Sequence, residues 1–464
     1  MNRITWCAMA LAVAAIPAYA QDSEVSKLRE ELNQLQQRLQ ALEKRLQETE
    51  AKSGKAEESA TRAESTATQA AAQAASRPQS ENALNPGISA ILNGVYSNLQ
   101  RDPNTYHISG FAPTMGDVGP GNRGLSLGES ELGVMSNIDH MFRGTLIASI
   151  SPDNSSIDVE EGYIQTLALS NGFTIKAGRF FSDIGYQNRI HAHAWDFTDA
   201  PLAMKAFLGG QLNEDGVQFK WIAPTELYFD LGAELGRGRA FPAAQRNKNG
   251  FGSSNLFTHL GGDIGDSVAW QGGLSLYATS PQDRAYTDVD STGTGVTNSF
   301  TGNSRLWVAS GVLKWSPHGN PTYSNFKLQG EYFHRKENGG LTYDTAGASL
   351  GTMNGGYSSR QSGWYAQGVY QFMPAWRVGY RYDRLDSGTT ALGLVDSGVL
   401  RAADFPILGA YNPKRHTFMV DWSPSEFSRV RLQFARDYSR MGLADNQIFL
   451  QYIVSLGAHG AHTF

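Results

Sequence analysis

The sequence predicts an all-β protein, a transmembrane antiparallel β-barrel of about 16 strands preceded by an N-terminal α-helical coiled coil. Three observations predict it. The 464-residue chain contains 50 Gly, 22 Phe, 19 Tyr and 9 Trp, a composition typical of strands and loops. Its C-terminal four-fifths consists of short stretches with a period of two. The connections between these stretches alternate between short turns and long polar loops, as they do in closed outer-membrane barrels.

Residues 1–20 have the features of a secretory signal peptide. Arg3 gives a basic start, an apolar stretch follows, and Ala18-Tyr19-Ala20 forms a small-x-small cleavage site. Cys7, the one cysteine, lies inside the apolar stretch. We therefore expect an exported mature protein without cysteine. This excludes a disulfide framework, a thiol nucleophile and a cysteine-ligated zinc site.

Residues 21–51 are predicted to form a coiled coil in the periplasm. Apolar residues recur at intervals of three and four, at Val25, Leu28, Leu32, Leu35, Leu39, Leu42 and Leu46. Such a stripe should drive self-association, and we favour a trimer. A lone amphipathic helix lying on a membrane is the alternative. Residues 52–83, rich in Ala, Ser, Thr, Gln and Glu, are a predicted linker to a barrel at 84–464.

The alternation is clearest at residues 227–235, 326–332, 376–383 and 429–434, where apolar residues of one parity alternate with polar residues of the other. A period of two places the two sets on opposite faces of a strand. A soluble β-sandwich would alternate as well, so the connections decide between the two folds.

Short turns and long loops follow one another along the chain. Turns containing Trp and Pro are expected at 221–224, 315–317, 373–376 and 422–424, and long loops at about 237–268, 279–304, 335–362 and 384–415. In an outer-membrane barrel the short turns face the periplasm and the aromatic residues lie at the lipid boundary. The barrel must close because lipid offers no hydrogen-bond partner to an open edge. Past the N-terminus no window approaches the ~20 apolar residues of a spanning helix, which excludes a helical membrane protein.

The inward parity of the strands predicts a polar lumen of mixed charge. The residues expected to line it are Lys176, Lys220, Asp230, Glu234, Lys327, Glu331, Arg377, Arg381, Arg429 and Arg431. Asp383 and Asp421 share the inward parity, and the slight basic excess of the whole set suggests a weak preference for anions. For each residue, the alternative is that its charge serves solvation only. The chain as a whole carries a net charge of -5, so we expect no binding of nucleic acid.

A long segment without alternation, about 180–216, is expected to fold into the barrel and narrow it. The residues expected at the constriction are Arg189, Trp195, Asp199 and Lys205. His191, His193 and Asp196 are candidate metal ligands, because two imidazoles two residues apart with a carboxylate suit zinc or copper. Hydrogen bonds that shape the constriction are the alternative role for these residues. No cofactor is required, and zinc is the one candidate.

No enzyme motif fits the predicted fold. Gly124-Leu125-Ser126-Leu127-Gly128 matches the G-x-S-x-G string, but a barrel has no strand-to-helix elbow for it. No Walker loop, dinucleotide fingerprint or HExxH helix is present. We therefore expect a protein that is not an enzyme.

The chain resembles the phosphate-selective porin O and P superfamily at residues 159–165 and 173–180. It resembles still more closely the barrel proteins labelled zinc-regulated TonB-dependent outer-membrane receptors, at residues 85–92, 124–132 and 191–197 and in its Gly-Ala-His ending. The resemblance covers about 84–464 and implies an outer-membrane barrel, with His191 and His193 as candidate zinc contacts. A receptor of that class has a plug domain ahead of a 22-stranded barrel. This chain begins its barrel near residue 84 instead.

These observations predict a bacterial outer-membrane porin for passive diffusion of small hydrophilic solutes or ions. Its expected partners are outer-membrane lipid, small solutes and further copies of the same chain. The alternative is a zinc-regulated outer-membrane receptor that takes part in uptake of zinc or a metal complex. A third hypothesis is an envelope tether whose coil binds the cell wall.

Overall fold

The computed structural model describes residues 86–114, 118–150, 156–244 and 249–457, together with Lys44. The chain divides into two compact units, residues 1–83 and 84–464. Lys44 lies in a helix. The rest of the predicted signal peptide, coiled coil and linker, and the Gly-Ala-His ending, lie outside the described residues. The predictions for them therefore remain predictions.

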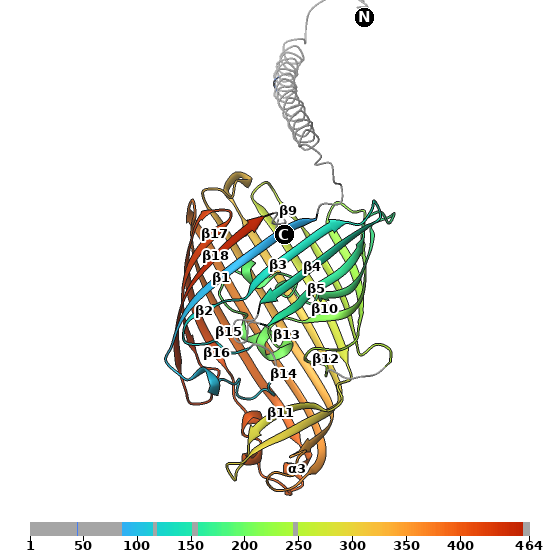
Figure 1. The fold of residues 1–464 in the computed structure, drawn as a ribbon, viewed down its shortest axis with the longest axis vertical. Coiled ribbons are helices and arrows are strands. Elements are labelled where there is room, and N and C mark those ends of the chain that lie inside the picture. The colour runs from blue at the N-terminus through green and yellow to red at the C-terminus, as the bar shows by residue number, and fades with distance from the viewer. Residues whose placement is uncertain (1–43, 45–85, 115–117, 151–155, 245–248, 458–464) are drawn as a thin grey trace, which may run out of the picture. The chain divides into compact units, whose positions relative to one another are not determined.

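Residues 87–457 form one antiparallel sheet that closes on itself (Figure 1), because β1 pairs with β18 and also with β2 and β3. Its strands are β1 (Gly87–Leu99), β2 (Gly124–Leu127), β3 (Ser130–Asn137), β4 (Phe142–Ile150), β5 (Ile157–Thr166), β6 (Phe173–Phe181), β7 (Asn213–Ile222), β8 (Tyr228–Gly236), β9 (Ser253–Ile264), β10 (Val268–Thr279), β11 (Arg284–Val289), β12 (Gly295–Trp315), β13 (Asn325–Tyr343), β14 (Met353–Met373), β15 (Trp376–Leu392), β16 (Lys414–Ser425), β17 (Ser428–Asp437) and β18 (Asp445–Gly457).

The barrel has 16 strands, as the sequence predicts, although the sheet contains 18 strand elements. Strands β2 and β3 pair with successive parts of β1, so together they form one interrupted strand. Likewise, β10 and β11 pair with successive parts of β12. The prediction of a closed antiparallel barrel is confirmed.

Helical structure in the described residues is short. It comprises α2 (Leu202–Leu208), α3 (Gly393–Asp396) and the 3-10 turns η1 (Pro103–Thr105), η2 (Ala192–Ala194), η3 (Pro317–Gly319), η4 (Ala402–Asp404) and η5 (Pro406–Leu408). Across the described ranges, no helix is both long and apolar enough to cross a membrane.

The two ends of the barrel differ as expected, but the long loops are shorter than predicted. Residues 374–375 and 426–427 connect strands at one end, the turn side. The segments predicted to be loops contain strands: β9 is a full wall strand within 237–268. At the other end, the loop side, β11 lies within such a segment and β12 to β15 extend well into others (Figure 1). These extensions were missed because their outward residues, such as Asn354, Ser358 and Arg360, are polar, and the hydrophobic alternation therefore disappears.

The outward face of the wall carries apolar side chains and the inward face polar ones. On β16 and β17, Phe418 and Leu432 are about half exposed, whereas Thr417 and Gln433 are fully buried inside. Tryptophans mark the turn side of the outer face. Trp376 and Trp422 stack there with ring centroids 6.1 Å apart. This distribution suits a cylinder surrounded by lipid, with aromatic side chains at the boundary.

Candidate functional site in the barrel interior

Residues 182–212, between β6 and β7, fill the middle of the barrel. The sequence predicts an inward segment at about 180–216; the strands pair up to Phe181 and Asn213, so the segment is slightly shorter. Asn188 joins the two ends of the segment by hydrogen bonds. The Asn188 side-chain amide donates to the carbonyl oxygens of Ser182 and Leu212 at 2.8 and 2.9 Å, and its oxygen accepts from the Leu212 amide at 2.7 Å. The inward segment is therefore a fixed loop whose two ends, its neck, are held together at Asn188.

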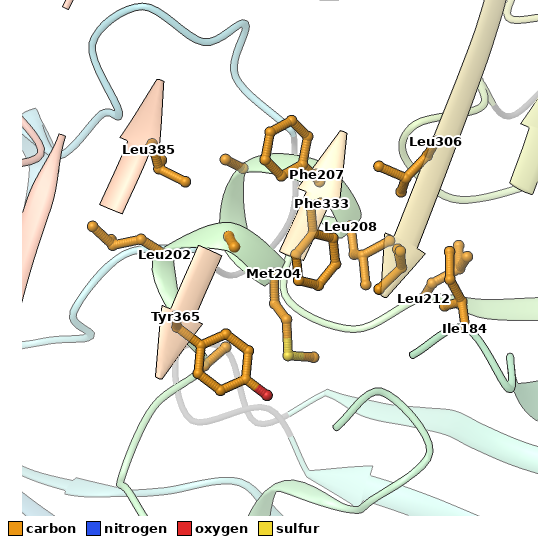
Figure 2. Packing of buried hydrophobic residues seen from close by; sticks show 14 of the residues in the cluster. Ile184, Leu202, Met204, Phe207, Leu208, Leu212, Leu306, Phe333, Tyr365 and Leu385 are labelled. Carbon is orange, nitrogen blue, oxygen red and sulfur yellow. The ribbon is translucent and has the colours of Figure 1, made fainter. Parts of the chain in front are cut away.

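Helix α2, in the second half of the inward segment, packs against an apolar patch of the inner wall. All seven α2 residues are buried, and the helix ends at Gly209, whose φ of 73° suits glycine. Figure 2 shows the α2 side chains beside Leu306, Phe333, Tyr365 and Leu385 of the wall. Phe207 stacks on Phe333 with ring centroids 5.9 Å apart. The predicted polar lumen of mixed charge therefore also contains an apolar patch, which the sequence analysis did not predict.

Asp199 is the polar anchor of the same half. Its carboxylate contacts Lys205 at 3.0 Å, Arg381 at 3.0 Å and Arg415. The side chain of Gln433 donates to it at 3.2 Å. Because these partners come from β15, β16 and β17, one carboxylate joins the inward segment to three adjacent strands. Removing one partner of such a buried network leaves charges without compensation.

Three more hydrogen bonds hold α2 and the turn before it. The Asp383 carboxylate accepts a hydrogen bond from the Leu202 amide at the start of α2, at 2.9 Å. The Trp195 carbonyl accepts from Arg431 at 2.7 Å and from Arg429 at 3.2 Å. The sequence analysis expected Trp195 and Lys205 to face an open constriction. Both side chains are buried instead, and they hold the segment to the wall. Arg189 is half-buried and donates to Gln271 at 2.9 Å.

The start of the inward segment is bound by two wall glutamates. Glu234 accepts from the Ser182 hydroxyl at 2.5 Å and from the Asp183 amide at 2.8 Å. Glu331 accepts from the Tyr186 amide at 2.5 Å and from the Tyr365 hydroxyl at 2.7 Å. These carboxylates therefore act as acceptors for the segment.

The ten residues expected to line the lumen lie on the inner side of the wall, in two environments. Asp230, Glu234, Glu331, Arg381 and Arg431 are buried, most of them beneath the inward segment. Lys176, Lys220, Lys327, Arg377 and Arg429 are half-buried. The accessible members are therefore all cationic.

These cations gather near the turn side. We call the following half-buried residues the turn-side cations: Lys176, Lys220, Lys314, Lys327, Arg377 and Arg429 of the wall, and Arg189 of the inward segment. Lys314 and Lys327 are directly opposite in the register of β12 and β13. The neighbouring carboxylates of Asp183, Asp196, Asp230 and Asp421 are buried. Lys220, Lys327 and Arg377 pair with these carboxylates. Seven cations against four buried carboxylates leave an excess of positive charge in this part of the lumen.

The two candidate histidines come together, but Asp196 does not join them. Asp196 contacts Lys327 at 3.0 Å and Arg377 at 3.1 Å. His191 and His193 stack with ring centroids 5.7 Å apart and contact glutamates of the wall instead. Sequence reasoning missed these glutamates, because the path of the inward segment, and not the spacing along the chain, decides which wall residues the histidines meet.

Comparisons with known proteins identify relatives of the barrel but no family. No family model matches the chain. An uncharacterized protein of Aquifex aeolicus (strain VF5) is 28% identical over 422 residues, covering 83% of this chain and 81% of that protein. Among solved structures, the chain is similar to OmpTdeltaL8, a loop-deletion mutant of an outer membrane protein of Vibrio cholerae, with a TM-score of 0.49, 11% identity, and 80% and 99% of the two chains covered.

Two further solved structures are similar over most of their length. One is the outer membrane channel DcaP of Acinetobacter baumannii, with a TM-score of 0.44, 12% identity, and 80% of this chain and 97% of that chain covered. The other is an anion-selective porin from Comamonas acidovorans, with a TM-score of 0.43, 10% identity, and 80% and 99% covered.

Proposed function

We propose that the protein is a bacterial outer-membrane channel that lets small hydrophilic solutes or ions diffuse passively, with a weak preference for anions. The observation that carries the proposal is the closed 16-stranded barrel whose outer face is apolar and whose accessible inner charges are cationic. A wall of 16 strands is too wide for wall side chains alone to fill. The inward segment then sets the width of the path.

The firm attachment of the inward segment supports a fixed constriction. Both its neck at Asn188 and its anchor at Asp199 are built from buried hydrogen bonds and ion pairs. A segment that had to leave the barrel during transport would need to break these contacts together, at a large cost. Solutes would therefore pass beside the segment.

The turn-side cations support the anion preference. Fixed charges of one sign along a pore attract ions of the opposite sign and repel those of the same sign. The nearby carboxylates are buried, so they reduce this field but do not face the solute. We propose further that the protein is a trimer whose predicted coil lies in the periplasm, supported by the heptad spacing of residues 21–51.

Conductance of the purified full-length protein in a planar bilayer tests the proposal. We expect stepwise increases in current, and a reversal potential in asymmetric salt that indicates anion preference. Lys176→Gln combined with Lys314→Gln should shift the reversal potential toward cation preference, because two lumen charges are removed. Lys336→Gln is the matched control: Lys336 lies exposed on β13 beside Trp307.

The possible results separate the two parts of the proposal. Absence of stepwise conductance from folded protein would reject the channel. Conductance with the same reversal potential in the double variant and the Lys336→Gln control would keep the channel and reject the role of the turn-side cations.

A further inference from the structure

A cluster of carboxylates and imidazoles lies where the first half of the inward segment meets the wall. Glu131 belongs to β3, Glu160 and Glu161 to β5, and His191 and His193 to the inward segment. The Glu129 carboxylate lies close to those of Glu131 and Glu160. Among these, Glu131, Glu160 and Glu161 are less than a tenth exposed.

A β-bulge explains why two neighbouring glutamates of β5 enter the same cluster. Ile147 of β4 pairs with Glu161, but the next residue, Ala148, pairs with Val159. Glu160 is therefore the extra residue of the bulge, and both Glu160 and Glu161 are buried. In a regular strand adjacent side chains point to opposite faces, whereas a bulge redirects one of them.

Two distances around His191 match those between ligands of one metal ion, while His193 Nδ1 lies at the hydrogen-bond distance of 2.7 Å from Glu131 Oε1. His191 Nδ1 lies 3.3 Å from Glu131 Oε2 and 3.3 Å from Glu160 Oε2. Two ligand atoms bound to Zn²⁺ at 2.0–2.2 Å in a tetrahedron are about 3.3–3.6 Å apart. One ligand atom each from Glu131, His191 and His193 lie within 4.8 Å of one another. Within the described residues, His191 Nδ1 and Glu160 Oε2 are buried without a hydrogen-bond partner.

The second nitrogen of His191 is arranged as in a metal-bound histidine. His191 Nε2 lies 3.0 Å from Glu161 Oε2. The other oxygen of Glu161 accepts from the Phe181 amide at 3.1 Å, which fixes the carboxylate. A metal-ligating histidine usually donates its other N–H to a carboxylate, and this bond orients the ring. Nδ1 of His191 is then left to face Glu131 and Glu160.

The charge of the cluster also favours a cation. Four carboxylates face two imidazoles in a largely enclosed place, and the ion pairs of Glu131 and Glu160 are with these histidines. A divalent ion would offset this excess of negative charge. Imidazole nitrogen favours zinc and the neighbouring transition metals over calcium and magnesium, which take oxygen ligands.

We propose that Glu131, Glu160, His191 and His193 bind one divalent transition-metal ion of the zinc class, and that Glu161 orients His191. The ion joins the first half of the inward segment to β3 and β5. This inference is independent of conduction, because metal binding is measured directly on the folded protein.

Titration of full-length, metal-free protein with Co²⁺ tests the site. We expect one Co²⁺ per chain, visible absorption bands of a four- or five-coordinate ion, and displacement by Zn²⁺ but not by an equal concentration of Ca²⁺. His191→Ala should abolish the bands. Glu161→Gln, which keeps the shape of the side chain, should weaken affinity about 10- to 100-fold.

Matched controls separate this site from other histidines. His416→Ala, on β16 beside Tyr380, and the pair His459→Ala with His462→Ala, outside the described residues, should leave the stoichiometry and the bands unchanged. Circular dichroism confirms that each variant is folded.

The proposal would be overturned by no Co²⁺ binding to the folded protein, by equal affinity in the parent and Glu161→Gln, or by loss of the bands in the His459/His462 variant. A Ca²⁺ ion that displaces Co²⁺ at equal concentration would also overturn it.

Discussion

The two halves of the inward segment are held to the same wall by different chemistry. Residues 200–208 lie in an apolar cluster and are anchored by the Asp199 ion pairs. The part around His191 and His193 meets a group of carboxylates. An apolar contact with paired charges is complete within the chain, whereas a carboxylate-rich contact gains from a cation. The α2 half is therefore fixed by contacts within the chain, whereas the proposed metal ion would add to the hydrogen bonds that already hold the histidine half.

Loss of the Asp199 charge should have the largest effect on the α2 half. Asp199→Asn leaves Lys205, Arg381 and Arg415 buried beside one another, and we expect the free energy of unfolding to fall by about 3–5 kcal/mol. Urea unfolding of the protein in detergent measures it. Asp386→Asn is the control, because Asp386 is exposed and accepts a local hydrogen bond from the Gly388 amide. Equal effects of the two variants would contradict the anchoring role.

Truncation of the apolar contact should come next. Leu202 is fully buried between α2 and the wall, so Leu202→Ala should lower the free energy of unfolding by about 3 kcal/mol. The same urea measurement applies. Leu350→Ala, in the loop between β13 and β14, should change it little because Leu350 is 44% exposed. A Leu202→Ala protein as stable as this control would show that α2 does not depend on its apolar contact.

Removal of metal should affect only the histidine half, with a smaller effect. At a Zn²⁺ concentration 100 times the dissociation constant, binding stabilises the folded state by about 2.7 kcal/mol. A chelator should therefore lower the melting temperature of the parent protein but not of His191→Ala, and the decrease should persist in Leu202→Ala. Equal decreases in the parent and His191→Ala would place the effect of the chelator elsewhere.

The sequence predicts the barrel well because a period of two fixes the face of every residue in a regular strand. The charged parity of β13 predicts that Lys327 and Glu331 face inward, and the structure places them there. The same parity includes Phe333, which packs against α2. Continuing the alternation two residues further would have identified the apolar patch.

The histidine cluster could be predicted only in part. His191 and His193 are conspicuous in the sequence, but their partners come from strands 30 and more residues earlier in the chain. Strict alternation would place Glu160 and Glu161 on opposite faces, so the bulge hides one of them. The assignment of Asp196 fails for a related reason: three residues after His193, the segment has already turned toward β13 and β15.

The extra residue in β5 has a consequence for how such a protein can change over time. On the outer face of β5, Val159 and Ile164 still form an apolar surface that suits lipid. The side chains of Glu160 and Glu161 both point into the barrel. One inserted residue can thus place a second acidic side chain inside the barrel without altering the strand number or the apolar outer surface. Change inside the barrel and constancy of its outer face thus become compatible within a single strand.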